Sequence, residues 1–366
     1  MAEITLDDLR HSYVPNPSAD DDWALKQLDV VWEDGGAYAL LGPSGCGKTT
    51  LLNIISGLLE PSHGRILFNK TDVSHMSPNE RHIAQVFQFP VVYDTMTVYD
   101  NLAFPLRNRG VPEGEVASRV AEIAEMTDLT PMLKQRASGL TADGKQKISL
   151  GRGLVRTDVN AILFDEPLTV IDPHLKWQLR SKLRELHQRV KTTMIYVTHD
   201  QTEALTFADK VVVMNHGVVV QVGTPQDLFE KPQHTFVGHF IGSPGMNVLP
   251  CSMRDGQAVI ADTEIGVANG GGANANTLEV GVRPEFVKFA ETGIPVTVTK
   301  VSDAGRHRIV DTRTKDAANG EVTIKLLVPE GGEVPAEDGN LAFDAAFTHL
   351  YSDGWLIGGK NAGNAA

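Results

Sequence analysis

Short apolar runs alternate with helical patterns over the first 240 residues of the chain. The runs at 37–41 (AYALL), 160–166 (NAILFDE) and 192–200 (TTMIYVTHD) predict buried strands, and the last two end in polar residues. This alternation is typical of a parallel α/β domain. Because ligands of an open parallel sheet bind beyond the carboxyl ends of its strands, we expect these polar ends to share one crevice.

Helix signals separate the predicted strands. Asp172 followed by Pro173 has the residue types of a helix start, and leucines then recur at helical spacing to give one apolar face. Asp200 with Glu203 three residues later has the spacing of a capping box at the start of another helix. Between residues 89 and 150 the pattern is mainly helical. We interpret that stretch as a helical subdomain inserted between strands of the sheet.

The pattern changes near residues 243–250, where the glycines and prolines of GSPGMNVLP are typical of a linker. Short runs broken by turn residues follow it, which predicts an all-β domain. We therefore predict an α/β domain over residues 1–243, with the helical subdomain at about 89–150, and an all-β domain over residues 244–366. Two glycine- and asparagine-rich segments are expected to form a loop and a disordered tail, at 266–276 and 358–366.

Composition and charge narrow the possible functions. The chain has 366 residues, which is long enough for two domains, and a formal net charge of −13. A nucleic-acid binder needs a basic surface, so this acidity argues against nucleic acid as a partner. The sequence has neither an apolar run long enough to span a membrane nor a signal peptide, and it has only two cysteines. We expect a cytoplasmic protein whose membrane role comes through a partner.

The most informative segment is GPSGCGKT at residues 42–49, which fits the P-loop pattern between a predicted strand and a predicted helix. Its glycines let backbone N–H groups face a phosphate, and the start of the helix adds positive potential. Lys48 is expected to reach the β- and γ-phosphates, and the Thr49 hydroxyl to hold Mg²⁺. Cys46 is interpreted as a packing residue, with redox sensing as the alternative. The residues expected to hold the phosphates are Gly42, Pro43, Ser44, Gly45, Cys46, Gly47, Lys48, Thr49 and Thr50.

Four polar residues near strand ends are candidates for the chemistry of phosphate cleavage. Asp165 and Glu166 end one predicted strand, where Asp165 suits a Mg²⁺ contact and Glu166 is placed to polarise the attacking water. His199 ends another strand, and its imidazole can donate a hydrogen bond near a γ-phosphate. Gln88 is a candidate for positioning the water and Mg²⁺, with an ordinary surface glutamine as the alternative. The phosphate loop upstream favours the functional interpretation of the two carboxylates.

These motifs and their order resemble those of the nucleotide-binding subunits of ABC transporters, in the maltose-importer-like carbohydrate group. The matching segments are GPSGCGKTT for the Walker A motif, VFQ for the Q-loop, ILFDEP for the Walker B motif, TVID for the D-loop and VTHDQ for the switch histidine. The resemblance implies a P-loop NTPase domain with an inserted helical subdomain, then an OB-like regulatory domain, with ATP and Mg²⁺ as ligands. It also implies that Tyr13 stacks on adenine, with Trp23 as its rival, and that Asp172 belongs to the nucleotide site through the D-loop.

One motif departs from the family pattern. The family signature is Leu-Ser-Gly-Gly-Gln, whereas this chain has Leu140-Thr141-Ala142-Asp143-Gly144 at the matching position. In the family this segment closes over the γ-phosphate bound to the other subunit, which assigns Thr141, Ala142 and Asp143 to that contact. A carboxylate about 5 Å from a phosphate oxygen would cost roughly 3 kcal/mol at an effective dielectric constant near 20. Three interpretations stay open: Asp143 points harmlessly into solvent, the chain pairs with a different ATPase subunit, or the site is inactive, which the intact catalytic motifs disfavour.

The signature region and the early segment LRHSYVPNP are most similar to an ATPase subunit of bacterial glycerol ABC importers. The resemblance implies an ATPase that energises uptake of a small polyol, glycerol first, with another sugar, polyol or glycerol phosphate as alternatives. The implied partners are two transmembrane permease subunits, a second ATPase subunit and, indirectly, a periplasmic solute-binding protein, at the cytoplasmic side of the bacterial inner membrane. The segment FPVVYDTMTV at 89–98 is the expected permease contact, with ordinary core as the alternative.

Two other classes of function compete with this one. A soluble ABC ATPase acting on DNA or ribosomes is disfavoured by the acidic charge, by the lack of a long coiled-coil insertion and by the β-rich C-terminal part. A regulatory subunit that binds nucleotide and hydrolyses it weakly is the remaining alternative.

Overall fold

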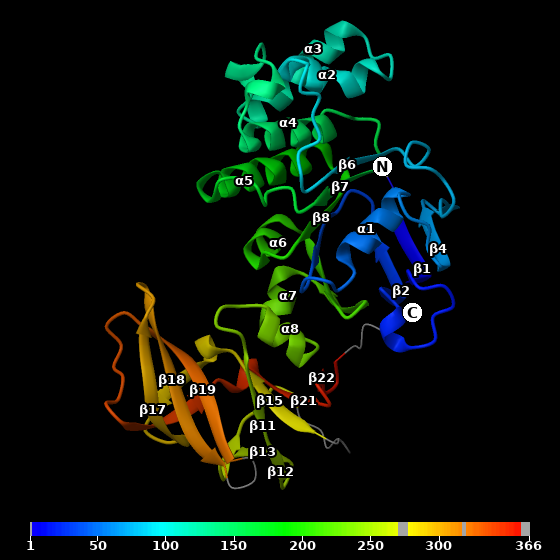
Figure 1. Ribbon diagram of the computed structural model, residues 1–366. Coiled ribbons are helices and arrows are strands. Elements are labelled where there is room, and N and C mark those ends of the chain that lie inside the picture. Colours follow the sequence, from blue (N-terminus) through cyan, green and yellow to red (C-terminus); the bar gives the residue numbers. More distant parts are fainter. Residues whose placement is uncertain (1, 270–276, 317–319, 360–366) are drawn as a thin grey trace. The chain divides into compact units, whose positions relative to one another are not determined.

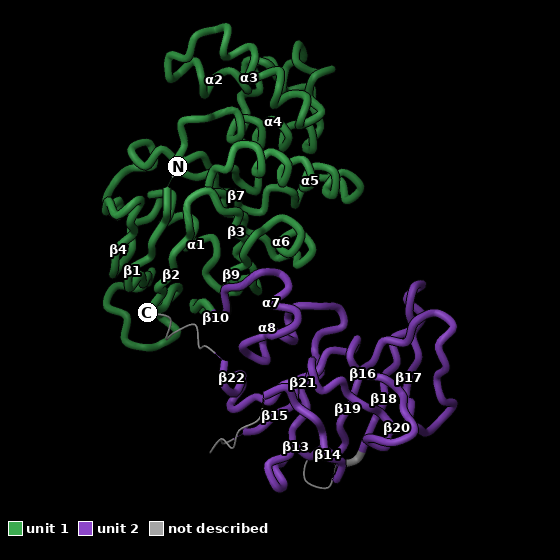
Figure 2. The backbone as a smooth tube through the Cα atoms, turned by 180° about the vertical axis from the view of Figure 1, so that it is seen from behind, with its two compact units in different colours: residues 1–219, 366 green, residues 220–365 purple. Residues whose placement is uncertain are grey.

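The computed structural model describes residues 2–269, 277–316 and 320–359. Contacts within the chain divide it into two compact units, one up to Val219 and one from Val220 onward (Figure 2). The division falls within β10 (Val218–Gly223). The domain boundary predicted at residues 243/244 lies further along the chain and stays a prediction.

A parallel sheet forms the centre of the first unit. Over the described residues its strands follow the order β10-β9-β3-β8-β7-β6, and the pairs β3–β8, β3–β9, β7–β8 and β6–β7 are parallel. The side chains of β3 and β8 are buried throughout, as in a parallel sheet covered on both faces. The structure thus confirms the buried strands predicted from the apolar runs. The other bounds in this sheet are β3 (Ala37–Leu41), β6 (Ile83–Val86), β7 (Ala161–Asp165), β8 (Thr193–Thr198) and β9 (Lys210–Asn215).

Three helices follow strands of this sheet, namely α1 (Lys48–Ser56), α5 (Pro173–Val190) and α6 (Gln201–Phe207). Helix α1 buries Leu51 and Ile55 in the same apolar core as Leu40 and Ile195 of the sheet. The predicted starts of the other two helices are confirmed. The Asp172 carboxylate accepts from the backbone N–H of His174, and the Asp200 carboxylate accepts from those of Thr202 and Glu203.

A smaller antiparallel sheet adjoins this core, with the strand order β2-β1-β4-β5. Its apolar side chains alternate with more exposed ones, so that Ile4, Leu6 and Trp32 enter the core cluster. The strand bounds are β1 (Ile4–His11), β2 (Leu25–Trp32), β4 (His63–Phe68) and β5 (Thr71–Asp72), with a short 3₁₀ turn at Asp20–Asp22.

The helical subdomain lies between β6 and β7 along the chain, and its helices α2, α3 and α4 gather beyond that edge of the sheet (Figure 1). Val116, Val120 and Ile123 form the buried face of α3, and Leu102 belongs to that of α2. The predicted insertion is therefore confirmed, although its last helix runs past residue 150. The bounds are α2 (Val98–Arg107), α3 (Glu113–Met126) and α4 (Ala142–Leu154), with 3₁₀ turns at Thr130–Met132 and Ala137–Gly139.

The second unit begins with two short helices and continues in antiparallel strands. Its strand orders over the described residues are β11-β15-β21-β22, β12-β13-β14 and β16-β20-β17-β18-β19. Val280, Ile294, Val310, Ile324 and Leu341 lie in its apolar core. The bounds are α7 (Pro225–Glu230), α8 (Thr235–Phe240), β11 (Asn247–Pro250), β12 (Ser252–Arg254), β13 (Gln257–Ile260), β14 (Thr263–Ile265), β15 (Leu278–Val282), β16 (Val287–Ala290), β17 (Ile294–Asp303), β18 (His307–Asp316), β19 (Gly320–Pro329), β20 (Asp338–Phe343), β21 (Thr348–Ser352) and β22 (Trp355–Leu356), with 3₁₀ turns at Pro284–Phe286 and Ala345–Phe347.

A buried arginine joins the helices of the second unit to its strands. The Arg283 guanidinium donates to the backbone carbonyls of Leu228, Phe229 and Ile241, and burial lowers its pKa to about 10. Most of the loop predicted at 266–276 and of the tail predicted at 358–366 lies outside the described residues. Across the part of the chain that is described, no helix combines the length and the apolar character needed to cross a membrane.

Candidate functional site

The predicted phosphate loop connects β3 to α1. Gly45 and Gly47 have φ values of 81° and 101°, in the left-handed region that favours glycine. A Cβ at Gly42 would lie 2.2 Å from the backbone oxygen of Met214, so only glycine fits there. The sequence therefore forms a tight loop that delivers the first turn of α1 at the carboxyl end of β3.

Lys48 occupies the inside of this loop. Its side chain is buried, and its ammonium donates to the backbone oxygens of Gly42 at 2.9 Å and Pro43 at 2.8 Å. Both oxygens are neutral, so these hydrogen bonds place no carboxylate against the ammonium and leave it available to an anion. The loop thus combines a helix start with a fixed ammonium, which is the arrangement that binds phosphate.

Cys46 packs behind the loop in the apolar core of the first unit. Its Sγ lies 3.7 Å from the Lys48 ammonium, and burial raises the pKa of the thiol despite this cation. Since the thiolate is the reactive form, these surroundings favour the packing interpretation over redox sensing.

The tip of β7 places two carboxylates beside the loop. The Thr49 hydroxyl donates to Asp165 over 3.4 Å, and burial followed by the neighbouring Glu166 raises the pKa of Asp165. Glu166 has a φ of 45°, which is uncommon for a side-chain-bearing residue and turns it out of the strand. Its backbone N–H donates to the oxygen of Val197 on β8. The strain is held by this contact between adjacent strands.

The tip of β8 brings the predicted histidine to the same place. His199 Nδ1 lies 3.1 Å from Glu166 Oε2, and the Thr169 hydroxyl lies 3.4 Å from the same oxygen. The side chain of His199 is 58% exposed, whereas that of Glu166 is 20% exposed, so the imidazole is the more accessible partner of the pair. The polar strand ends predicted to lie together do so, since Glu166 contacts His199 and Asp165 contacts Thr49 of the phosphate loop.

Other predicted residues surround this centre less closely. The Tyr13 side chain is 64% exposed, and its hydroxyl lies 3.2 Å from the Thr50 hydroxyl, next to the phosphate loop. Trp23, its rival, is half-buried. Gln88 lies in a bend just after β6 and is also half-buried. Ser44 and Gly45 are exposed at the outer turn of the loop.

The signature segment forms the start of α4. The Thr141 side chain caps this helix by accepting from the backbone N–H of Gly144 at 3.3 Å, and Ala142 is exposed beside it. The Asp143 carboxylate faces Lys147, with Oδ2 3.6 Å from the ammonium, and its side chain is 29% exposed. Its other oxygen, Oδ1, is buried with no hydrogen-bond partner in the described residues. The interpretation in which Asp143 points into open solvent does not match this arrangement.

One prediction about the site is wrong in part. Glu203 has the spacing of a capping-box glutamate, but its carboxylate turns to the hydroxyls of Tyr196 and Thr198 on β8. Lys176 of α5 is its further partner. Tyr196, Thr198 and Lys176 were not predicted from the sequence as neighbours of the site. The phenol of Tyr196 within an otherwise apolar run was the one signal that a buried polar partner lies nearby.

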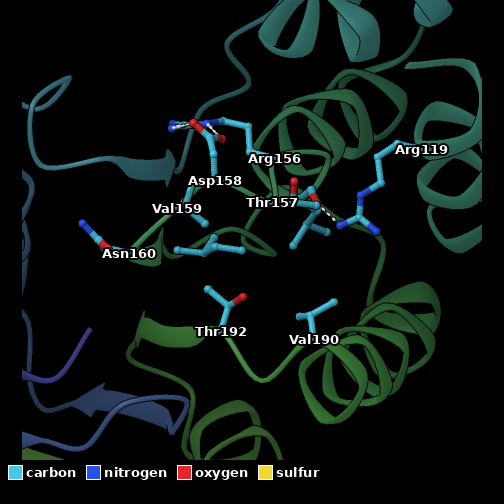
Figure 3. A pocket seen from close by; sticks show the side chains of 10 residues that line it. Arg119, Arg156, Thr157, Asp158, Val159, Asn160, Val190 and Thr192 are labelled. Carbon is cyan, nitrogen blue, oxygen red and sulfur yellow. Dashed lines mark hydrogen bonds and ion pairs between the residues drawn. The ribbon is translucent and has the colours of Figure 1, made fainter. Parts of the chain in front are cut away.

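A cavity of about 430 Å³ lies at the opposite end of the sheet, before β7 and β8 begin (Figure 3). In the figure, Arg156 and Asp158 line one side of it, and Val190 and Thr192 the other. None of the predicted site residues lines this cavity. The strand tips and the phosphate loop therefore remain the candidate site.

Comparison with known proteins identifies the fold. Residues 25–169 match the ABC transporter family. An sn-glycerol-3-phosphate import ATP-binding protein of Psychromonas ingrahamii is 36% identical over 96% of this chain and 93% of its own length. A trehalose import ATP-binding protein of Mycobacterium tuberculosis is 41% identical over 79% of this chain and 74% of its own. The chain belongs to the ABC transporter family.

Solved structures agree with this assignment. The cbiO1 protein of Clostridium perfringens, part of an ABC transporter complex, matches 62% of this chain and 90% of its own with a TM-score of 0.55 and 27% identity. A dimeric ATP-binding cassette bound to ADP and Pi has the same fold, with a TM-score of 0.54 and 23% identity. The family predicted from the motif order is confirmed, as is the fold class of a P-loop ATPase domain with a helical insertion followed by an all-β OB-like part. This ABC ATPase binds ATP.

Proposed function

We propose that this ABC ATPase is the ATP-hydrolysing subunit of a membrane importer. The observation that carries the proposal is the Glu166–His199 contact of 3.1 Å at the strand tips, beside a phosphate loop with a buried lysine. Lys48 binds the β- and γ-phosphates, Glu166 polarises the attacking water, and His199 holds the geometry of that water and the γ-phosphate. Tyr13 stacks on the adenine, while Gln88 and Asp172 approach the γ-phosphate from their loops.

The metal that this chemistry requires is Mg²⁺. Thr49 and Asp165 offer a hydroxyl and a carboxylate that already contact each other, and hard oxygen donors of this kind suit Mg²⁺. Gln88 is the third residue assigned to it. When bound, Mg²⁺ would offset the negative charge that develops on the phosphates. Asp165 would hold the metal as a carboxylate, and burial raises the pKa of this group.

The permease contact is assigned to the start of the helical subdomain. Phe89, Val91 and Tyr93 are exposed by 70%, 51% and 40%, which argues against the ordinary-core alternative for this segment. A cavity of about 270 Å³ next to it is lined by Phe87, Val91 and Phe104 among others. Two transmembrane permease subunits would dock here, one on each ATPase subunit, at the cytoplasmic face of the inner membrane, and a periplasmic binding protein would supply the solute from the other side.

The transported solute is assigned as a small polyol, with glycerol as the first candidate. The signature departure at Asp143 supports an importer with two unlike ATPase subunits, which the resemblance to glycerol importers implies. Glycerol 3-phosphate is the second candidate, because relatives that match nearly the whole chain carry that solute in their names. The chain is co-expressed with its permease and binding-protein subunits, and uptake of labelled glycerol, glycerol 3-phosphate and trehalose decides between these solutes.

The ATPase role is tested with Glu166→Gln, which keeps the size of the side chain and removes the base. We expect turnover to fall at least about 100-fold while ATP binding persists, so that the nucleotide-bound dimer accumulates. Glu185→Gln is the matched control, since Glu185 is an exposed glutamate of α5. Steady-state phosphate release and size-exclusion chromatography with MgATP measure both effects. Wild-type turnover in Glu166→Gln would contradict the assignment.

A further inference from the structure

A buried carboxylate lies behind the histidine of the site. Glu203 is 4% exposed, and its Oε2 accepts from the Tyr196 hydroxyl at 3.1 Å and from the Thr198 hydroxyl at 2.9 Å. Burial raises the pKa of Tyr196 far above its usual value, so the phenol keeps the proton that it donates. A buried carboxylate is costly unless its oxygens are bonded, and here two hydroxyls from β8 supply those bonds.

The contacts of Glu203 bracket His199. Thr198 directly precedes the histidine, and its hydroxyl oxygen accepts in turn from the backbone N–H of Asp200, at 3.0 Å, directly after it. Thr198 is therefore bonded directly to the buried acid and Asp200 is connected to it through the Thr198 hydroxyl, while the imidazole contacts Glu166. The backbone path through the histidine has little freedom to move as long as these bonds last.

A lysine ties the same acid to α5. The Lys176 ammonium lies 3.6 Å from Glu203 Oε1, and Lys176 belongs to the first turn of the helix that Asp172 caps. Its backbone N–H also donates to the carbonyl of Asp172. Glu203 thus connects the segment that carries Asp172 with the segment that carries His199.

We propose that Glu203 is a positioning residue for hydrolysis, which fixes His199 through Thr198 and registers it against α5 through Lys176. The proposal rests on the proposed function and adds a residue to it. The carboxylate oxygens of Glu203 contact Tyr196, Thr198 and Lys176, so its loss is expected to move the imidazole rather than to remove a ligand of the nucleotide. The consequence is a defect in turnover with nucleotide binding retained.

The experiment uses the full chain and three variants, Glu203→Gln, Tyr196→Phe and Lys176→Met. A glutamine places an N–H₂ group against hydroxyl donors and loses the charge that attracts Lys176. We expect kcat for ATP to fall roughly 10- to 100-fold in Glu203→Gln and less in the other two, with KM within about twofold of wild type. Lys182→Met is the matched control, because Lys182 lies on the same helix and pairs with Asp128 instead; its kcat stays at the wild-type value.

A second arm separates positioning from general structural damage. Glu203→Gln is combined with His199→Ala, and single-turnover hydrolysis is followed with enzyme in excess. If Glu203 acts through His199, adding Glu203→Gln to the His199→Ala variant lowers the single-turnover rate by less than about twofold. An equal fall in both backgrounds, or wild-type turnover in Glu203→Gln and Lys176→Met, overturns the proposal. Should Glu203→Gln fail to fold, as a thermal melt would show, Lys176→Met carries the same cycle.

A different result would contradict the proposed function. If the wild-type chain releases no phosphate from ATP, or if Glu166→Gln does not abolish that release, the ATPase assignment itself is wrong. If wild-type turnover is normal and depends on Glu166, only the Glu203 variants decide the present proposal.

Discussion

Helices α1 and α4, which begin at the phosphate loop and at the signature segment, carry opposite charges at their starts in this chain. Helix α1 begins after a left-handed Gly47, has no acid in its first turn and carries the buried Lys48. Helix α4 begins after Thr141 and carries Asp143 in its first turn. A helix start favours an anion, and a carboxylate placed there occupies the role that a phosphate would take. The chain thus has one start made for phosphate and one that opposes it.

The opposition at α4 is partly compensated within the helix. Lys147, four residues after Asp143, is buried and points its ammonium at the carboxylate over 3.6 Å. A separation of 3.6 Å is a weaker contact than a direct hydrogen bond, and one oxygen of Asp143 stays without a partner in the described residues. The difference between the helices suits a dimer of unlike ATPases, in which this chain's own loop faces an intact signature from the other subunit.

Removing the charge of α1 gives the largest expected effect. Lys48→Ala should weaken MgATP binding by at least about 30-fold, because it removes a buried cation from a charged hydrogen-bonded contact. Lys145→Ala is the control on α4, where the ammonium pairs with Asp94 away from the loop. Isothermal titration with MgATP measures both. An affinity that survives Lys48→Ala would remove the basis for treating α1 as the phosphate-binding start.

Removing the Asp143 charge at the start of α4 should have a smaller effect, and it should strengthen rather than weaken an interaction with nucleotide. Asp143→Gly is expected to strengthen nucleotide-dependent association of the subunits by roughly tenfold, because it removes a carboxylate from the surface that the proposed dimer places against the partner's γ-phosphate. Lys147→Met should weaken the same association, since it leaves Asp143 uncompensated. Both are measured by sedimentation with MgATP in the Glu166→Gln background, with the second ATPase subunit present.

Asp143→Asn controls for the flexibility that glycine adds to a helix, and it should act in the same direction as Asp143→Gly. Equal association in wild type and both Asp143 variants would show that the carboxylate does not reach the partner's nucleotide. The opposite charges at the starts of α1 and α4 would then have no consequence for nucleotide binding.

Local signals in the sequence were sufficient for much of this site. The phosphate loop, the polar ends of two strands and the caps at Asp172 and Asp200 depend on residues within a few positions of each other. The Asp143–Lys147 contact has the i, i+4 spacing of a helical ion pair, so it was within reach of the same reasoning.

Contacts that depend on the folded chain were not predictable in this way. The Glu203 side chain does not complete a capping box, because Tyr196 and Thr198 on the adjacent strand donate two hydroxyl hydrogen bonds to it in a buried place. Arg81 is similar, since its guanidinium is buried and donates to the carbonyls of Ile54 and Ile55, more than twenty residues earlier in the chain. Buried polar groups take whatever partner the fold brings near, and sequence spacing does not say which one.

The smallest expected effect concerns the cap of α4. Thr141→Ala should destabilise the chain by about 0.5–1 kcal/mol, because the Gly144 N–H loses its acceptor, and Thr141→Ser should restore most of it. Thr97→Ala is a matched control at the start of α2, where the bond to the Asp100 N–H is shorter, at 3.0 Å against 3.3 Å, and the loss should be larger. Urea unfolding measures all three. Helix α1 begins after a glycine, so its start depends on loop geometry and not on a side-chain cap. A large loss of unfolding free energy in Thr141→Ala would mean that α4 depends on its cap far more than the long Thr141–Gly144 bond implies.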